Sequence, residues 1–345
     1  MRNLTFNNCV TAISQIWDWE WVYQGISINN CQVGLNIAAG SGTSNGLSVG
    51  SVTLIDSSIT NTPVGIITGW IAGGSISTAN SLMMENIVFN NVPIAVQQVS
   101  GATVLAGGSL TIAAWGEGNE YTPNGPKALS GTFTANSRPT SLLSGSTYYT
   151  RSKPQYQTSP VTSFSSVRSA GASGNGVTDD TTALQNIINS ATAAGHIVFF
   201  DAGTYRITST LIIPPGAKIV GEAYARIMSS GPFFNNMDSP QPVVQVGAPG
   251  STGQVEWSDM IVSTQGQQQG AILIQWNLAT NGSLPSGMWD VHTSVGGFTG
   301  SNLQVTQCPV TASSTAVNTN CIAAYMTMHV APSASGLYME NVSRF

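Results

Sequence analysis

The amino-acid sequence predicts an all-β protein built from two tandem parallel β-helices, the second of which is opened by a short helix. Three observations predict this class. A phrase centred on asparagine recurs at solenoid spacing near the N-terminus, a helix followed by short apolar strands begins near residue 180, and charged residues make up only 7% of the 345 residues. A typical soluble domain carries roughly 25% charged residues. Glycine, serine, threonine and asparagine must therefore cover much of this surface, which suits a secreted protein rich in turns.

The first β-helix is predicted from a ladder of four similar phrases. The asparagines at 8, 30, 61 and 91 are separated by 22, 31 and 30 residues, and such steps match one solenoid coil. Apolar residues alternate within each coil, as in strand, turn and strand. A leucine-rich repeat fits the same pattern but needs a nearly constant repeat length, so the uneven steps favour a β-helix. The phrases are Phe6-Asn7-Asn8-Cys9, Ile28-Asn29-Asn30-Cys31, Ile59-Thr60-Asn61-Thr62 and Phe89-Asn90-Asn91-Val92.

The ladder ends after Val96, and the composition changes further along. From Trp115 to about Gln155 the chain is rich in Gly, Ser, Thr and Pro with little periodicity, which predicts a linker or a long excursion packed over the solenoid. We therefore predict three parts: the end of a first β-helix over 1–114, a linker over 115–160, and the beginning of a second β-helix over 161–345.

The second β-helix is predicted to begin with a helix that caps its edge. Asp179 or Asp180 is placed to cap this helix, Ala194 lies near its end and Gly195 terminates it. A helix before a run of strands hides an edge that would otherwise pair with another chain. The predicted strands are 197–200, 203–207, 211–213, 218–220, 243–246, 260–262 and 272–275.

The four cysteines form two candidate pairs. Cys9 and Cys31 lie one coil apart in the predicted solenoid, which permits either a disulfide or a stack of buried thiols, and we favour the thiols. Cys308 and Cys321 close a 13-residue loop rich in Ser, Thr and Asn, for which we expect a disulfide. No zinc-ligand spacing is present, so we expect no metal and no cofactor.

The charge pattern and the apolar runs exclude several classes of partner. Ten basic and fifteen acidic residues give a net charge of -5, and the basic residues are scattered along the chain. This argues against nucleic acid and polyanionic partners. The longest apolar runs, such as 197–200, have the length of a strand and are too short to span a membrane.

Several motifs carry a resemblance to a known family. Asp179-Asp180-Thr181, Phe200-Asp201-Ala202-Gly203-Thr204-Tyr205 and Ile219-Val220-Gly221-Glu222 resemble the opening of pectate-lyase-like β-helix domains. Together with the asparagine ladder, the cluster Trp17-Asp18-Trp19-Glu20-Trp21 and the Cys308–Cys321 segment, they make the whole chain similar to family-55 glycoside hydrolases. These are fungal secreted exo-β-1,3-glucanases built from two tandem right-handed β-helices.

The resemblance implies an inverting hydrolysis of β-1,3-glucan at a groove between the two helices. In an inverting enzyme one group, the general acid, protonates the oxygen of the glycosidic bond and a second group activates the attacking water, and the two groups lie about 6.5 to 9.5 Å apart. The general acid of the family is a Glu expected beyond Phe345, so the resemblance implies a chain truncated at both ends. The attacking water would be held by Gln15, or by Ser14 if the order is shifted, and by Ser48. Glu222 would belong to the proton path, or would be a simple coil corner.

The tryptophans form a second candidate feature. Trp17, Trp19 and Trp21 alternate, so a regular strand would place all three on one face. An exposed aromatic strip of this kind is costly unless it meets a sugar or another domain. We therefore expect substrate binding or packing between the two helices.

Two other functional classes stay open from sequence. A polyuronate lyase of the same fold would need calcium-binding carboxylates with a nearby Arg or Lys, and the coils show no Asp cluster of this kind. A β-helix without catalysis, such as an adhesin or a carbohydrate-binding module, would need no general acid.

Overall fold

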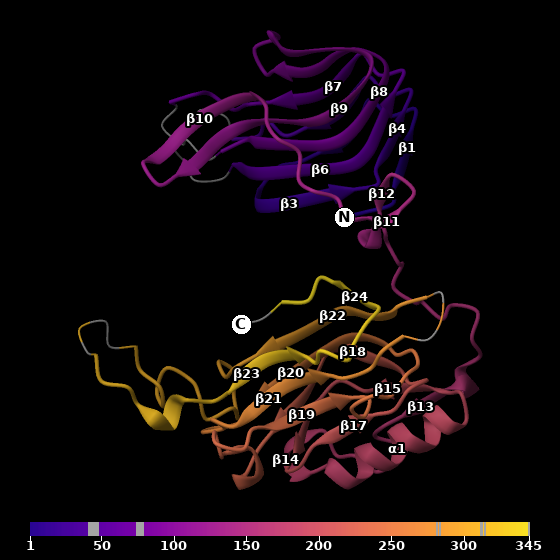
Figure 1. Ribbon diagram of the computed structural model, residues 1–345, viewed down its shortest axis with the longest axis vertical. Helices are drawn as coiled ribbons and strands as arrows, with labels where there is room; N and C mark the ends of the chain where they lie inside the picture. The colour runs from indigo at the N-terminus through magenta and orange to yellow at the C-terminus, as the bar shows by residue number, and fades with distance from the viewer. Residues whose placement is uncertain are drawn as a thin grey trace. The chain divides into compact units, whose positions relative to one another are not determined.

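The computed structural model describes residues 1–40, 48–73, 79–280, 282, 284–310, 313 and 315–343, and only the backbone of 223 and 224 (Figure 1). The chain divides into two compact units, Met1–Thr150 and Arg151–Phe345. Most strands pair in parallel in each unit, which confirms the predicted class of parallel β-helix.

The first unit is a solenoid whose coils are in register with the asparagine ladder. Thr5 lies opposite Ser27, Ser27 opposite Ser58 and Ser58 opposite Val88. These partners are 22, 31 and 30 residues apart, the same steps as the asparagines. The strands of the coils are β1 (Thr5–Asn7), β2 (Thr11–Ser14), β3 (Asp18–Gln24), β4 (Ser27–Asn29), β5 (Val33–Asn36), β6 (Val49–Thr60), β7 (Val64–Thr68) and β8 (Ser81–Gln98).

The ladder asparagines form one corner of each coil. Asn8, Asn30, Asn61 and Asn91 all have left-handed backbone geometry, with φ between 49° and 59°. Asparagine tolerates this region far better than most residues with a side chain. The amides also stack, because Asn91 Nδ2 donates to Asn61 Oδ1 at 2.9 Å. The asparagine recurs in each phrase because each coil makes a sharp turn that requires left-handed backbone geometry at this position.

The edge of the last coil in the first unit is covered by antiparallel strands. β9 (Thr103–Thr122) pairs antiparallel with β8, and β10 (Gly125–Thr132) pairs antiparallel with β9. Figure 1 shows β8 and β9 curving together across this end of the unit. Regular structure thus continues to 132, where the sequence showed little periodicity. Antiparallel pairing saturates the free edge of β8, so this edge cannot recruit another chain.

Stacked apolar side chains fill the first unit. Leu35, Ile66 and Val96 are fully buried and occupy equivalent positions in successive coils. Cys31 is buried and Cys9 half-buried, and both are free thiols, with the Cys9 backbone N–H donating to Cys31 Sγ at 3.3 Å. These two cysteines therefore form the stack of thiols rather than a disulfide.

The second unit opens with α1 (Thr181–Ala193), which lies along β15 and β17 (Figure 1). Gly195 follows it with φ of 73°, the left-handed geometry that ends many helices. The strands are β13 (Phe164–Ser166), β14 (Asn175–Asp179), β15 (Ile197–Phe200), β16 (Thr204–Ile207), β17 (Leu211–Ile213), β18 (Lys218–Ser229), β19 (Gln241–Val246), β20 (Glu256–Thr264), β21 (Ala271–Trp276), β22 (Ser286–Ser294), β23 (Met326–Val330) and β24 (Leu337–Glu340). Two parallel sheets wind through this unit, β17-β19-β21-β23 and the sheet that contains β18, β20 and β22.

The start of α1 differs from the expected cap. Asp180 occupies the N-cap position, but its carboxylate accepts hydrogen bonds from the backbone N–H groups of Ser173 and Gly174, outside the helix. Asp179 instead accepts from the backbone N–H of Thr181 at 3.1 Å. The preceding loop folds back over Asp180 and takes its carboxylate, which is why local sequence alone could not separate the two aspartates.

A long coil in the second unit carries the disulfide. Cys308 and Cys321 are bonded, with their Cα atoms 5.8 Å apart. They lie between β22 and β23, next to a short 3-10 helix, Thr319–Cys321. The other 3-10 helices are Thr140–Leu142, Val161–Ser163 and Pro232–Phe234.

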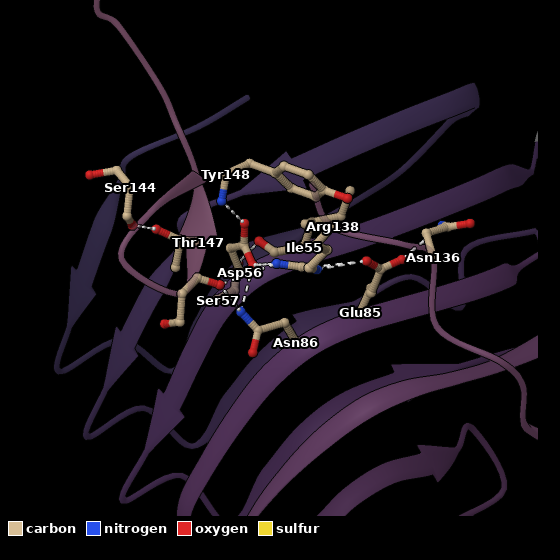
Figure 2. Close-up of polar contacts among 11 residues, drawn as sticks. Ile55, Asp56, Ser57, Glu85, Asn86, Asn136, Arg138, Ser144, Thr147 and Tyr148 are labelled. Atoms are coloured by element: carbon tan, nitrogen blue, oxygen red, sulfur yellow. Dashed lines mark hydrogen bonds and ion pairs between the residues drawn. The ribbon is translucent and has the colours of Figure 1, made fainter. Parts of the chain in front are cut away.

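The segment after β10 packs back against the coils of the first unit, and an ion-pair cluster holds it there. Arg138 Nη1 lies 2.6 Å from Asp56 Oδ1, and Arg138 Nη2 lies 2.9 Å from Glu85 Oε1. Figure 2 shows Asn86, Asn136 and Tyr148 around the same carboxylates. The hairpin of β11 (Leu143–Ser144) and β12 (Thr147–Tyr148) is held in the same place, because the Tyr148 N–H donates to Asp56 Oδ2 at 2.8 Å.

The second unit has a comparable cluster within itself. Lys153 Nζ lies 2.7 Å from Asp259 Oδ1 and 2.9 Å from Asp290 Oδ2. Asp259 and Asp290 have left-handed backbone geometry at coil corners, as Asp56 has in the first unit. On each side of the boundary between the units, a basic side chain therefore forms ion pairs with aspartates at coil corners of its own unit: Arg138 in the first unit and Lys153 in the second.

Candidate functional site

The end of β2 and the start of β3 bring three polar side chains together in the first unit. The backbone N–H of Gln15 donates to the carbonyl of Asn36 at 2.9 Å, which fixes Gln15 to the next coil. Its Nε2 then donates to Asp18 Oδ2 at 2.7 Å, and its Oε1 accepts from the Tyr23 hydroxyl. The orientation of the Gln15 amide is therefore set by an acceptor on one side and a donor on the other.

Asp18 is the carboxylate of this group and is only 6% exposed. Its second oxygen, Oδ1, accepts from the backbone N–H of Gly50 at 3.2 Å. A side chain at 50 would collide with the neighbouring strand, because its Cβ would lie 2.3 Å from the carbonyl oxygen of Trp19. Glycine therefore allows the close approach that satisfies Asp18.

The polar group changes the acid–base behaviour of Tyr23. Burial, and to a lesser degree the charge of Asp18, raises the pKa of Tyr23 to about 12. The phenol therefore stays protonated well into the alkaline range, and it donates its hydrogen to Gln15. This arrangement leaves the other hydrogen of Gln15 Nε2 available to an incoming group.

A surface hollow of about 230 Å³ opens beside Asp18. It is lined by Trp17 and Trp19 on β3 and its approach, and by Ser48 from the segment that precedes β6. The remaining lining residues are Gly50, Ser51 and Ala79. Two of the predicted sugar-binding tryptophans and the predicted water-binding serine therefore border one hollow, whose wall contains Asp18, the partner of Gln15.

The three tryptophans do not share one face. Asp18 and Tyr23 are both buried although they are five positions apart, so the strict alternation of β3 is broken between them. The ring of Trp17 contacts that of Trp19, with centroids 5.3 Å apart, whereas Trp21 packs toward Tyr23 at 6.3 Å. Trp19 is 83% exposed, and it is the most open of the three indoles.

Ser14 and Glu222 lie away from this hollow's lining. Ser14 is exposed at the end of β2, opposite Asn36. Glu222 belongs to β18 of the second unit, is exposed, and accepts a hydrogen bond from the backbone N–H of Ala202 at 2.7 Å. Their proposed roles stay predictions.

Asp18 was missed by the sequence reasoning, although it sits inside the tryptophan cluster. The available signal was the position of this carboxylate between Trp17 and Trp19. Its buried position could not be read from the sequence, since strict alternation would have grouped the tryptophans instead.

The described part of the chain contains no group of three or more His, Cys, Asp or Glu side chains placed to hold a metal ion. Among the same residues, no helix is long and apolar enough to cross a membrane.

Comparison with known proteins agrees with this architecture. The family model for rhamnogalacturonase A/epimerase, pectate lyase-like, matches residues 1–36 and 164–288. A glucan 1,3-beta-glucosidase of Cochliobolus carbonum is 46% identical over 99% of this chain, and a probable glucan endo-1,3-beta-glucosidase of Arthroderma benhamiae is 34% identical over 99%. A non-secreted LysM effector, LysM19 of Penicillium expansum, is 36% identical over 96%. The chain spans 43%, 49% and 27% of these three relatives.

The fold and the family model define a pectate-lyase-like parallel β-helix protein. Within that class, the chain is similar to fungal proteins named glucan 1,3-beta-glucosidase and glucan endo-1,3-beta-glucosidase, in agreement with the resemblance of its motifs to the family-55 glycoside hydrolases.

Proposed function

We propose that this chain carries a glucan-binding and water-positioning part of a β-1,3-glucan hydrolase. One observation carries the proposal: the chain is 46% identical over nearly its whole length to a protein named glucan 1,3-beta-glucosidase. The hollow bordered by Trp17, Trp19 and Ser48 supports it, because indole rings stack on the apolar faces of sugars while polar groups bind their hydroxyls.

In the proposed mechanism, Gln15 and Ser48 hold the water that attacks the anomeric carbon. Asp18 is a positioning residue, because it accepts one hydrogen of Gln15 Nε2 and so directs the other outward. Tyr23 donates to Gln15 Oε1 and prevents the amide from turning over. An inverting enzyme requires such a fixed water on the face of the sugar opposite the leaving group.

The finer assignments belong to the same proposal. Cleavage would proceed from a chain end with inversion of configuration, and Glu222 would carry a proton in the second unit. The partner would be β-1,3-glucan, without nucleic acid or membrane, and the protein would act outside the cell.

The first test is incubation of the purified chain with laminarin, with released glucose and retained polysaccharide both measured. Trp19→Ala should weaken glucan binding about tenfold, the scale expected for one exposed aromatic anchor. Tyr325→Ala is the matched control, since Tyr325 is an exposed aromatic of the second unit outside this hollow. Equal binding by the wild type and Trp19→Ala would contradict the proposed role of the hollow.

A second candidate is glucan binding without hydrolysis. It is favoured by the relative named as a LysM effector, which shares 36% identity with this chain under a name that mentions no hydrolase. Retention on laminarin without any release of glucose by the chain would support this alternative. Stoichiometric inversion of the anomeric centre, followed by NMR, would exclude it.

A further inference from the structure

A second hollow of the first unit has the character of a sugar site. It has a volume of about 230 Å³ and lies between β6, β8 and the β9–β10 hairpin. Its lining includes Ser51, Ser81 and Glu117, together with the more apolar Met83, Tyr121 and Phe133. Polar groups that could bind hydroxyls therefore stand beside an aromatic surface.

Glu117 is the most unusual residue of this hollow. Its side chain lines the hollow although only 3% of the residue is exposed. Its Oε1 has no hydrogen-bond partner among the described residues, and leaving such a group unpaired in a protein interior costs free energy. Burial raises the pKa of Glu117, and the neighbouring Thr68 side chain acts in the opposite direction. A carboxyl of this kind can both donate to and accept from a hydroxyl group.

The glycines on either side of Glu117 keep its surroundings open. A Cβ at 116 would lie 3.0 Å from the carbonyl oxygen of Leu82, and a Cβ at 118 would lie 3.0 Å from Ser81 Oγ. A side chain at either position would therefore crowd the neighbouring strand β8 beside the hollow.

The rim offers an exposed aromatic ring. Tyr121 is 70% exposed and Met83 is 44% exposed, so both present apolar surface to solvent beside the buried carboxyl. These side chains offer contact area to a ligand, the tyrosine with an apolar ring and a hydroxyl that can hydrogen-bond. A pyranose ring has the matching shape, because it offers an apolar face of C–H groups and an edge of hydroxyls.

The two hollows of the first unit are neighbours. Ser51 lines both the hollow beside Trp19 and the hollow over Glu117. A chain of sugars bound at the tryptophans would therefore reach the second hollow by passing Ser51.

We propose that the hollow over Glu117 is a second saccharide subsite, in which a glucosyl residue stacks on Tyr121 and hydrogen-bonds to Glu117. A β-1,3-glucan chain held beside Trp19 continues into it past Ser51. This subsite rests on the proposed function, because it assumes that the tryptophan hollow binds β-1,3-glucan.

The test compares a short and a longer laminari-oligosaccharide, laminaribiose and laminaripentaose, by calorimetry on the full chain, with the products checked by chromatography. Tyr121→Ala should bind the pentaose about tenfold more weakly, the scale of one lost aromatic anchor, and should bind the disaccharide unchanged. Tyr325→Ala should match the wild type for both sugars. Because Tyr121 is largely exposed, its removal should leave thermal unfolding unchanged.

A second pair of variants tests the carboxyl. Glu117→Gln keeps a hydrogen-bonding group and should retain most of the pentaose affinity, whereas Glu117→Ala should lose it. If Tyr121→Ala binds both sugars as the wild type does, the subsite is refuted while the tryptophan hollow stands. If the wild type binds neither sugar, nor laminarin, the proposed function and the subsite are both refuted.

Discussion

Replacing Arg138 with alanine would leave two nearly buried carboxylates without their counter-charge. The side chains of Asp56 and Glu85 are 2% and 8% exposed, and both lie within 3 Å of the Arg138 guanidinium. Removing one partner of a buried ion pair typically costs about 3 to 5 kcal/mol. Because Arg138 itself is 17% exposed, we expect the lower end, about 3 kcal/mol.

The loss should appear as a lower melting temperature of the first unit. At roughly 2 to 4 °C for each kcal/mol in a domain of this size, Arg138→Ala should lower the melting temperature by about 6 to 12 °C. Calorimetry of the full chain measures the melting temperature. The value for Arg138→Lys should fall between those of the wild type and Arg138→Ala, because lysine keeps the positive charge but lacks the planar guanidinium group. Lys127→Ala, which removes an exposed cation from β10 of the same unit, is the control and should change little. A melting temperature for Arg138→Ala equal to that of Lys127→Ala would refute the reasoning.

Four further changes test other parts of the structure. Lys153→Ala should cost less than about 1 kcal/mol, because this lysine is 30% exposed and water screens its ion pairs; a larger loss in urea denaturation would contradict this. Asn61→Ala should cost about 1 to 2 kcal/mol at its left-handed corner, and Asn61→Gly should melt closer to the wild type than the alanine variant does. Cys308→Ser should cost about 3 kcal/mol, the entropy of a loop of this length, and reducing agent should then have no further effect. Glu117 binds its proton more tightly in the folded protein than in the unfolded chain, so stability should fall as pH rises from the ordinary Glu value of 4.5 through the raised folded pKa; Glu117→Gln should lack this fall in a series of melts at different pH values.

The coil spacing could be read from the sequence because corner geometry is a local property. Asn8, Asn30, Asn61 and Asn91 adopt a backbone region that most residues avoid, so asparagine must recur wherever the coil turns sharply. The end of α1 at Gly195 follows from the same kind of local constraint. Features of this type depend on one residue and its neighbours, and they were predicted with the correct bounds or spacing.

The candidate site combines hydrogen bonds within one coil with contacts to the next coil, where Asn36 accepts from the Gln15 N–H and Gly50 donates to Asp18, and local patterns do not record the latter. Gln15 is oriented by Asp18 and Tyr23 because β3 changes the face it buries, and β6 changes with it, since the paired residues Val49 and Leu54 are buried as well. Strict alternation within one strand predicted instead a row of three tryptophans.

The sequence by itself determined the solenoid repeat and the position of the capping helix, because repeated turns and strand-length apolar runs depend on each residue and its near neighbours. Only the tertiary structure decided which polar groups meet. It joined Asp18 to the Gly50 N–H of the next coil, gave Arg138 two carboxylates from neighbouring coils, and buried the Glu117 side chain of β9. The physical reason is that a coil brings together residues about thirty positions apart, and the facing of each strand is settled by the coil on which it stacks.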